Sequence, residues 1–505
     1  MFESAELGHE IDRERYEAEV PTLRTQLLAA QYEVVKQRAF SAVILIAGVD
    51  GAGKGDTLNT LNEWMDPRHL QTNAIRPVNE GLDGRPPMWQ FWRALPKRGG
   101  LAVFVGSWYT APLLRRVYRE TTTAELDQEI DDILRFEAML ADEGTLVLKF
   151  WLHLTKQQQR KRFKQLEHDA RTAWRVGPTD WKHLAMSKRF QSTAQHLLRG
   201  TSTATAPWLI VEGTDERYRN MTIGTAILAA LRAQLAARPQ PEPGREPDGG
   251  SPRAAAVEDA PRAFVPLDGK TVLDALELDH PITKDEYQDE LARLQSRLNL
   301  ATRRKRFDKR SVVAVFEGAD AGGKGGAIRR VTQALDARKY DVIPIAAPSD
   351  EEKARPYLWR FWRQVPERGR IAIFDRSWYG RVLVERVEQF CSVSDWARAY
   401  GEINDFEEQL IENDTVVVKF WLQISKDEQL RRFEERRQVA YKQHKITDED
   451  WRNRDKWDAY HDAVCEMIDR TSTEAAPWTL IGANNKHHAR LAVLRGMVDA
   501  IEAAL

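Results

Sequence analysis

Short runs of apolar residues, separated by longer amphipathic segments, set the pattern of the second half of the chain. Residues 312–316 form the first run, and residues 327–335 follow it with the periodicity of a helix. The runs are continuous rather than alternating, which is typical of parallel strands that helices cover on both faces. Further strands are predicted at 342–346, 371–374, 416–422 and 478–481, and further helices at 357–364, within 395–412 and from 427 onward. The pattern predicts an α/β fold with a five-stranded parallel sheet flanked by helices.

A repeat with a constant offset joins the two halves of the chain. The sequence GVDGAGKGD starts at Gly48, and GADAGGKGG starts at Gly318, 270 residues later. The same offset aligns FWR at 91 with 361, SWY at 107 with 377, KFWL at 149 with 419, and APW at 206 with 476. Because this register holds over about 160 residues without a net gap, it indicates duplication of a whole domain rather than a solenoid repeat.

A segment rich in Pro, Gly and charged residues separates the two copies. It shows no apolar periodicity, so we expect a linker there. The predicted domains are therefore 1–237 and 264–505, joined by a linker at 238–263. Each copy begins with a predicted helix, near 10–38 in the first and near 283–306 in the second.

Composition restricts the class of protein. Among 505 residues, 42% are apolar and 30% are charged, which is typical of a soluble globular protein without a membrane partner. The charged N-terminus differs from a signal peptide, so we expect a cytoplasmic location. Two cysteines, Cys391 and Cys465, are too few for a disulfide framework or a thiolate zinc site and are expected to be buried. The net charge of -1 gives no general attraction to nucleic acid, so anion binding must depend on local clusters.

The second copy carries a G-x-x-x-x-G-K motif between its first strand and the following helix. Glycines at this place turn successive backbone N–H groups toward a phosphate, and Lys324 can reach along the phosphate chain. The residues expected to cradle phosphate are Gly318, Ala321, Gly322, Gly323, Gly325 and Gly326. Gly325 stands where the usual motif has the Ser or Thr that holds Mg²⁺. Carboxylates must therefore hold the metal, and Asp320 is the first candidate.

A second candidate carboxylate follows a later strand. Asp375 comes directly after the apolar run 371–374, at the carboxyl edge of the predicted sheet, where α/β folds bind ligands. We expect Asp375 to share Mg²⁺ with Asp320, and Arg376 to neutralise charge on a transferring phosphoryl group. The alternative is that Asp375 caps a helix N-terminus.

Basic residues form two sets in the second copy. The first set is interleaved with aromatic residues and comprises Lys353, Arg355, Arg360, Arg363, Arg368 and Arg370. The second comprises Arg431, Arg432, Arg436, Arg437, Lys442 and Lys445, where nucleotide kinases carry a helical lid. One alternative for the second set is a solvated helix face paired with Glu428, Glu434 and Glu435. Both sets together favour a substrate with many negative charges.

A further polar segment, 447–460, closes the second basic set. Asp455 and Lys456 are candidates to orient a nucleotide or phosphate at the base of the lid. The alternative is helix packing by Trp451 and Trp457, with ion pairs on the outside.

These motifs in combination resemble the family 2 polyphosphate kinases over residues 283–505. The resemblance implies a kinase-like P-loop fold and a transfer from inorganic polyphosphate to a nucleotide that depends on Mg²⁺ or, as an alternative, Mn²⁺. The tandem arrangement and the sequence GRVLVERV are similar to the two-domain group that converts AMP to ADP. The resemblance assigns metal binding and catalysis to Asp320 and Asp375, phosphate binding to Lys324 and Arg376, a lid cation to Arg436, and substrate contacts to Glu385 and Asp455.

The first copy keeps the loop residues Asp50, Gly53 and Lys54 but departs from the pattern elsewhere. Val105 replaces Asp375, Gly106 replaces Arg376, and Arg115, Leu166 and Ala185 stand for Glu385, Arg436 and Asp455. Loss of a charge-neutralising carboxylate costs orders of magnitude in rate, so the first domain is predicted to be catalytically silent. It would pair with the second domain as two subunits of a homo-oligomer do, or dock a polyanion through Lys54, Arg93, Lys97 and Arg98.

Two other functions stay open from the sequence. One is an ATP-dependent nucleoside or nucleotide kinase on the same fold. The other is a non-catalytic polyanion or nucleic-acid binder, against which the carboxylates Asp320 and Asp375 argue, because a binder of anions does not need them.

Overall fold

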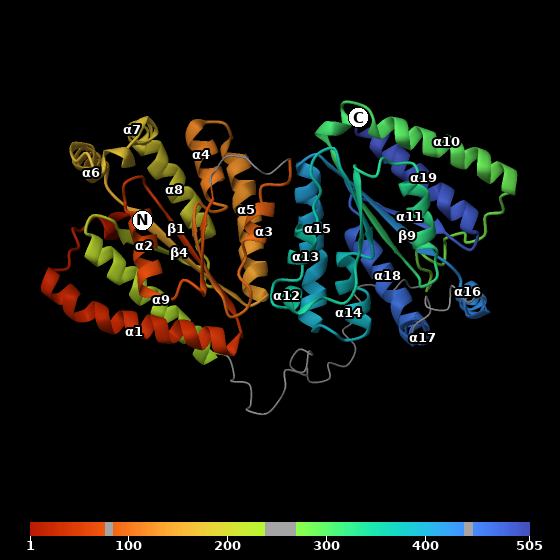
Figure 1. Cartoon of the computed structure of the whole chain (residues 1–505), viewed down its shortest axis with the longest axis horizontal. Helices are drawn as coiled ribbons and strands as arrows, with labels where there is room; N and C mark the ends of the chain where they lie inside the picture. The colour runs from red at the N-terminus through yellow and green to blue at the C-terminus, as the bar shows by residue number, and fades with distance from the viewer. Residues whose placement is uncertain (76–83, 238–268, 439–447) are drawn as a thin grey trace. The chain divides into compact units, whose positions relative to one another are not determined.

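The computed structural model of the chain describes residues 1–75, 84–237, 269–438 and 448–505 (Figure 1). These residues form two compact units, one built mainly from 1–237 and the other mainly from 269–505, with 348–359 counted in the first unit and 84–89 in the second. The linker predicted at 238–263 lies outside the described residues, as do Lys442 and Lys445.

The first half of the chain contains a sheet of five strands with its helices. The strands are β1 (Ser41–Gly48), β2 (Leu70–Ala74), β3 (Leu101–Val105), β4 (Thr145–His153) and β5 (Trp208–Glu212). The helices are η1 (Glu3–Ala5), α1 (Arg13–Gln37), α2 (Lys54–Trp64), α3 (Trp89–Arg93), α4 (Thr110–Tyr118), α5 (Thr123–Asp142), α6 (Lys156–His168), η2 (Ala173–Arg175), α7 (Pro178–Ala185), α8 (Ser187–Thr201) and α9 (Glu216–Ala237).

The second half repeats this order. Its strands are β6 (Ser311–Gly318), β7 (Tyr340–Pro344), β8 (Ile371–Asp375), β9 (Thr415–Gln423) and β10 (Trp478–Gly482). Its helices are α10 (Lys284–Thr302), η3 (Phe307–Lys309), α11 (Lys324–Thr332), α12 (Asp350–Lys353), α13 (Trp359–Trp362), η4 (Trp378–Arg381), α14 (Val384–Val387), α15 (Val393–Glu412), α16 (Lys426–Gln438), α17 (Asp448–Asp455), α18 (Trp457–Thr471) and α19 (Lys486–Ala503).

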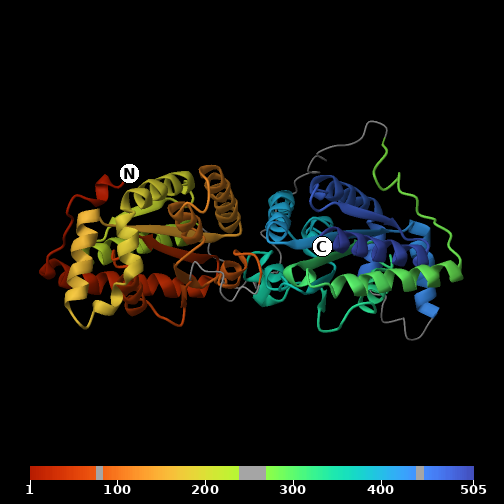
Figure 2. The ribbon, with the colours of Figure 1, turned by 90° about the horizontal axis from the view of Figure 1, so that it is seen from above.

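Both sheets are parallel and have the same strand order, which confirms the predicted fold. The first runs β2-β3-β1-β4-β5, and the second runs β7-β8-β6-β9-β10. In the second half, α10, α11 and α19 pack on one face of the sheet, and α15 packs on β9 from the other. Figure 2 shows helices on both sides of the sheet in each unit. The glycine loops after β1 and β6 thus lie at the carboxyl edges of their sheets, and so do the equivalent strand ends at Val105 and Asp375.

One predicted helix is much shorter than expected. The basic aromatic segment 357–364 is helical only over α13, Trp359–Trp362. Pro356 and Pro366 bracket it, and proline both lacks a backbone N–H and disfavours helical geometry in the residue before it. The aromatic side chains of the segment are buried, so packing rather than helix length fixes its place.

A buried polar network anchors the SWY motif of the second half. Lys419 Nζ lies 2.7 Å from Glu407 Oε2 and donates to the Thr471 carbonyl oxygen at 2.7 Å. Tyr379 and Trp378 donate to Glu407 Oε1 at 2.7 and 3.0 Å. All four donor and acceptor side chains are buried, so the charges are satisfied by one another rather than by water.

The first half contains the same network. Lys149 Nζ lies 2.7 Å from Glu137 Oε2, and Tyr109 and Trp108 donate to Glu137 Oε1 at 2.6 and 3.1 Å. The first half has Val105 and Gly106 before its SWY motif, whereas the second half has Asp375 and Arg376 there. The SWY motif therefore belongs to the shared scaffold and not to the chemistry of one half.

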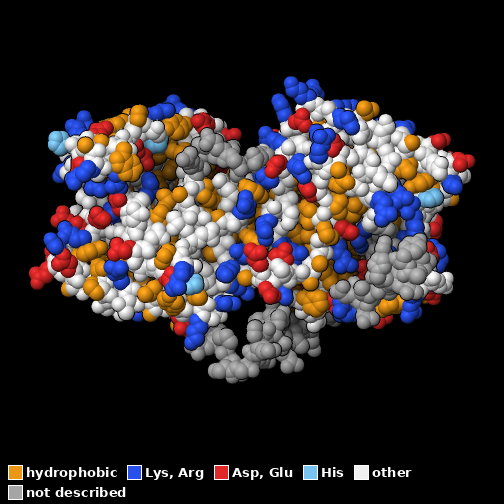
Figure 3. All heavy atoms as spheres, viewed as in Figure 1, with side chains coloured by type: hydrophobic (Ala, Val, Ile, Leu, Met, Phe, Trp, Pro, Cys, Tyr) orange, Lys and Arg blue, Asp and Glu red, His pale blue; other side chains and the backbone are white. Residues whose placement is uncertain are grey.

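The surface carries both signs of charge. Figure 3 shows Lys and Arg interspersed with Asp and Glu over the visible face of each unit.

Cys391 and Cys465 are free thiols and half-buried, which corrects the expectation that they are fully buried. Among the helices that the structure describes, none is long and apolar enough to cross a membrane.

Candidate functional site

The glycine loop of the second half joins the end of β6 to the start of α11. Gly318 has φ +147°, and a Cβ atom there would lie 2.5 Å from the Leu422 carbonyl oxygen, so this position requires glycine. Gly323 adopts left-handed geometry, with φ +110°, as the residue before α11. Lys324 Nζ donates to the Gly318 carbonyl oxygen at 2.6 Å, which folds the lysine back over the loop. The loop thus has the form expected of a phosphate cradle.

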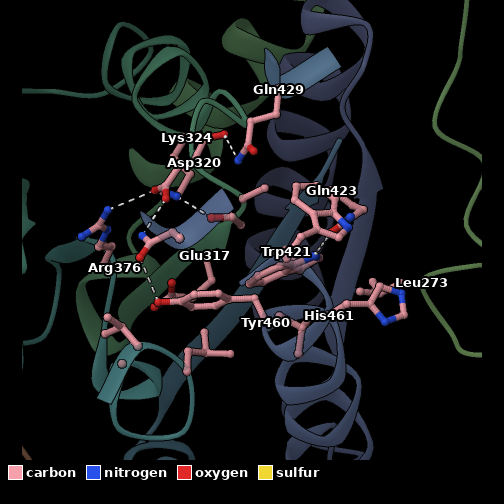
Figure 4. A pocket seen from close by; sticks show the side chains of 18 residues that line it. Leu273, Glu317, Asp320, Lys324, Arg376, Trp421, Gln423, Gln429, Tyr460 and His461 are labelled. Carbon is pink, nitrogen blue, oxygen red and sulfur yellow. Dashed lines mark hydrogen bonds and ion pairs between the residues drawn. The ribbon is translucent and has the colours of Figure 1, made fainter. Parts of the chain in front are cut away.

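Side chains from three elements orient Asp320 at the centre of the site (Figure 4). Arg376 Nη2 lies 3.2 Å from Asp320 Oδ1, and Asn453 Nδ2 donates to Oδ2 at 2.9 Å. Gln429 on α16 donates to the Asp320 backbone carbonyl at 3.1 Å. The carboxylate is therefore held toward the pocket, beside one arginine, and remains largely buried.

Asp375 ends β8 opposite Phe316 of β6. Its carboxylate makes no hydrogen bond or ion pair with a residue that the structure describes. The alternative that Asp375 caps a helix is wrong, because Ser377 is the residue whose side chain accepts from the backbone of η4. Asp375 does not line the pocket itself; it adjoins Arg376, which does.

Arg376 occupies a strained backbone position. Its φ is +66°, a left-handed conformation that costs a residue with a Cβ atom about 1–2 kcal/mol. The equivalent residue of the first half is Gly106, with φ +82°. A non-glycine residue is thus kept where glycine fits better, which is typical of functional positions.

We expect Arg376→Gly to lower catalytic activity about a hundredfold, because the substitution removes the cation that the sequence analysis expects beside a transferring phosphoryl group. Folding stability should stay the same or rise by up to about 1 kcal/mol, because the strain is relieved. Steady-state kinetics and urea denaturation measure the two effects. Arg376→Lys, which keeps both charge and strain, serves as the comparison. Loss of stability together with activity would contradict this interpretation.

Several pocket residues were missed by the sequence predictions. They are Glu317, Trp421, Gln423, Gln429, Asn453 and Tyr460. Glu317 is buried at the end of β6 and accepts a hydrogen bond from Ser377 Oγ at 2.8 Å. Burial raises the pKa of Glu317, against the opposing charge of Lys324. A carboxyl group beside the loop lysine is a further candidate for proton or metal contacts.

Three predicted substrate residues do not line this pocket. Glu385 forms an ion pair with Arg381 at 2.8 Å, Asp455 is exposed at the end of α17, and Arg436 is half-buried on α16. Lys456 lies 2.9 Å from Glu388 Oε2 rather than pointing to the loop. The alternative, helix packing, holds for Trp451, which packs on Phe433, whereas Trp457 lines the pocket.

The second basic set is divided between two environments. Arg432 is only 2% exposed, and it donates to the carbonyl oxygens of Ala321 at 2.8 Å and Ala483 at 2.6 Å. Arg432 therefore holds the backbone of the glycine loop in place through Ala321. Arg431 is exposed and lies 2.7 Å from Glu428, as the solvated-face alternative predicts.

A divalent cation fits the site only with help from phosphate. No cluster of three or more His, Cys, Asp or Glu side chains suited to a metal occurs within the described ranges. Mg²⁺, however, is commonly held by one or two carboxylates, with waters and substrate phosphates as the remaining ligands. Asp320 and Asp375, whose carboxylate has no partner among the described residues, are the candidates for such a set at one edge of the sheet.

The glycine loop of the first half has kept its shape without these partners. Lys54 Nζ donates to the Gly48 carbonyl oxygen at 2.8 Å, as Lys324 does to Gly318. At Gly106, a Cβ atom would lie 2.0 Å from the Ile75 carbonyl oxygen. The backbone has therefore closed over the place that Arg376 occupies in the second half.

A glycine loop with its lysine and carboxylates at the carboxyl edge of a parallel sheet defines a P-loop phosphate-binding protein. The model of the polyphosphate kinase 2 family matches residues 10–239 and 281–505, and the chain belongs to that family.

Two relatives and one solved structure match the chain from end to end. A polyphosphate:AMP phosphotransferase of Pseudomonas aeruginosa is 54% identical over 505 residues, covering 100% of this chain and 99% of the relative. Another of that name, from Pseudomonas syringae, is 49% identical over 504 residues, with 100% and 99% covered. A crystal structure from Pseudomonas aeruginosa PA01, provisionally named polyphosphate kinase 2, superposes with a TM-score of 0.86 at 51% identity, with 100% and 99% covered.

Proposed function

We propose that the chain is a phosphotransferase that moves the terminal phosphoryl group of inorganic polyphosphate to AMP, giving ADP and a shortened polyphosphate. The observation that carries this proposal is that Lys324 folds over the glycine loop onto the Gly318 carbonyl while Arg376 pairs with Asp320, at the loop edge of the second sheet where β8 ends in Asp375 (Figure 4). The names of the two full-length relatives agree with it.

The residues of the second half divide the work as follows. The backbone N–H groups of the loop receive the end of the polyphosphate chain, and Lys324 exchanges the Gly318 carbonyl for a phosphate oxygen. Arg376 offsets the charge that spreads over the transferring group. Asp320 and Asp375 would hold the divalent cation, Mg²⁺ or Mn²⁺, which when bound would neutralise phosphate charge.

The reaction exchanges one phosphoanhydride bond for another. An oxygen of the AMP phosphate attacks the terminal phosphorus, a new P–O bond forms, and the bond to the next phosphate of the chain breaks. No covalent intermediate with the protein is needed, and the reaction is reversible. The aromatic side chains Trp421 and Tyr460 line the same pocket and offer a place for the nucleobase.

The first half is proposed to be catalytically silent, because Val105 and Gly106 replace the acid and the arginine of the second. Four further proposals rest on the sequence alone. They are the pairing of the two halves as in a homo-oligomer, the docking of a polyanion on the first half, the domain limits 1–237 and 264–505, and the cytoplasmic location.

The donor test separates this function from an ATP-dependent kinase. With AMP as acceptor and Mg²⁺ present, we expect polyphosphate to support ADP formation and ATP to support little or none, as measured by chromatography of the nucleotides. EDTA should abolish the activity, because it removes the divalent cation that the two carboxylates are proposed to bind. Added Mg²⁺ should restore it. Faster turnover with ATP as the sole donor would favour the nucleotide kinase instead.

A further inference from the structure

The first half contains a pocket of its own at the carboxyl edge of its sheet. Residues of the glycine loop, Asp50 and Lys54, line it. Apolar and aromatic side chains, among them Leu113, Trp151 and Phe190, line it too. A cavity lined both by a phosphate-binding loop and by aromatic side chains has the general form of a nucleotide site.

The charges around this pocket differ from those of the second half. Ala47 stands for Glu317, and Val105 stands for Asp375. Lys188, which stands for Asp458, lines the pocket together with Lys54 and with Lys156, a lysine that both halves share. The first pocket is thus suited to an anion without a metal ion to neutralise it.

The carboxylate of the glycine loop, Asp50, is paired with two side chains. His183 Nδ1 lies 2.7 Å from Asp50 Oδ2, and Lys54 Nζ lies 3.4 Å from Oδ1. Burial alone would raise the pKa of Asp50, but the Lys54 charge and the His183 hydrogen bond outweigh it and lower the pKa to about 2. His183 occupies the place of Asn453, and its other nitrogen lies 2.7 Å from the Tyr118 hydroxyl. Imidazole and lysine therefore take the place that the cation has in the proposed site of the second half.

Three buried polar atoms of pocket residues have no partner among the described residues: Trp151 Nε1, His153 Nδ1 and Ser187 Oγ. Trp151 and His153 are the most deeply buried of these residues, at 3% and 4% exposed. In the second half the equivalent tryptophan is satisfied, because Trp421 Nε1 donates to Gln423 Oε1 at 2.7 Å. Buried polar groups are normally hydrogen-bonded, so this donor and acceptor point to a ligand.

The unpartnered atoms of Trp151 and His153 have complementary hydrogen-bonding roles. His153 Nε2 lies 2.7 Å from the Glu6 carboxylate, which can only accept, so Nε2 is the donor, and in that tautomer of the imidazole Nδ1 is an acceptor. Trp151 Nε1 is a donor. A heterocycle with both an acceptor and an N–H group, such as a nucleobase, satisfies the pair, whereas a phosphate chain alone offers no such edge.

We propose that the first half binds a nucleoside phosphate without a metal ion and does not turn it over. The phosphate lies on the loop that ends in Lys54, and the base lies against Trp151 and His153. Without counterparts of Asp375 and Arg376, the bound nucleotide is not a substrate there, so this pocket is a ligand site separate from the proposed catalytic one.

Equilibrium dialysis of the full-length protein with AMP in EDTA tests the proposal. We expect two AMP molecules per wild-type chain, and the affinity of one of them should fall at least tenfold in Lys54→Ala and severalfold in Trp151→Phe. Lys164→Ala, which removes an exposed lysine of α6 outside the pocket, should leave both unchanged. Trp421→Phe is the matched change in the second half, and it should spare the site that Lys54→Ala weakens. Circular dichroism melts confirm that each variant is folded.

Two results would overturn the proposal. One is a single AMP per chain whose affinity is unaffected by Lys54→Ala and Trp151→Phe in folded protein. The other is inorganic phosphate competing for the Lys54-dependent site as well as AMP does, which would mean that the base is not recognised. Competition by phosphate at least tenfold weaker than by AMP supports a site for the whole nucleotide.

Discussion

ADP formation from AMP and polyphosphate falls by at least about a thousandfold in Asp375→Asn, because asparagine keeps the shape of the side chain but loses its charge. Without that charge, the site holds a divalent cation less well, and the cation is needed to offset the phosphate oxygens. Asp320→Asn should have a loss of similar size, since the two carboxylates are proposed to hold the same ion. Initial rates at saturating substrates and a range of Mg²⁺ concentrations measure both variants.

Asp289→Asn is the matched control for these changes. It removes one negative charge from an exposed position on α10, so its rate should be that of the wild type. Retention of more than about a tenth of wild-type activity by Asp375→Asn would contradict the assignment, because removal of a group that stabilises transition-state charge costs more than that.

Lys419→Met destabilises the second half by about 3–5 kcal/mol, because it leaves the Glu407 carboxylate buried without its partner. The side chains of Lys419 and Glu407 are 0% and 2% exposed, so water does not replace the lost contact. Urea denaturation, followed by circular dichroism, should show one of two transitions moved to lower urea while the other stays in place.

The double variant Lys419→Met with Glu407→Leu provides the control. It removes both charges and fills their volume with apolar groups, which is less destabilising than removing one charge of a buried pair. If Lys419→Met leaves both transitions at their wild-type midpoints, the network does not have the structural role that its duplication indicates.

The fold was predictable because the sequence encodes it twice. Continuous apolar runs predicted the strands of the second sheet within about two residues, as with 342–346 and the observed Tyr340–Pro344. The constant offset then transferred the same order to the first half. The segment 357–364 was predicted less well, because prolines on both sides limit the helix and burial of its rings holds it in place instead.

The glycine loop and the Asp375–Arg376 pair could be identified as candidates from the sequence, because each is a contiguous motif that directly follows a predicted strand. Glu317 and Asn453 were missed, because their contacts with Ser377 and Asp320 join segments far apart in the chain. A signal was present: Glu317 places a charge in an apolar run where the first half has Ala47. Glu385 rested on resemblance alone and Asp455 also on its place at the base of the presumed lid, and the pocket is not lined by either.

The closed backbone around Gly106 has a consequence for the history of the molecule. A side chain there would meet the Ile75 carbonyl at 2.0 Å, so the arginine of the other half cannot return by one substitution. The strand end near Ile75 would have to move first, a change that confers no benefit until the arginine and an acid at Val105 are both present. The loss of chemistry that we propose for the first half is therefore hard to reverse by single substitutions.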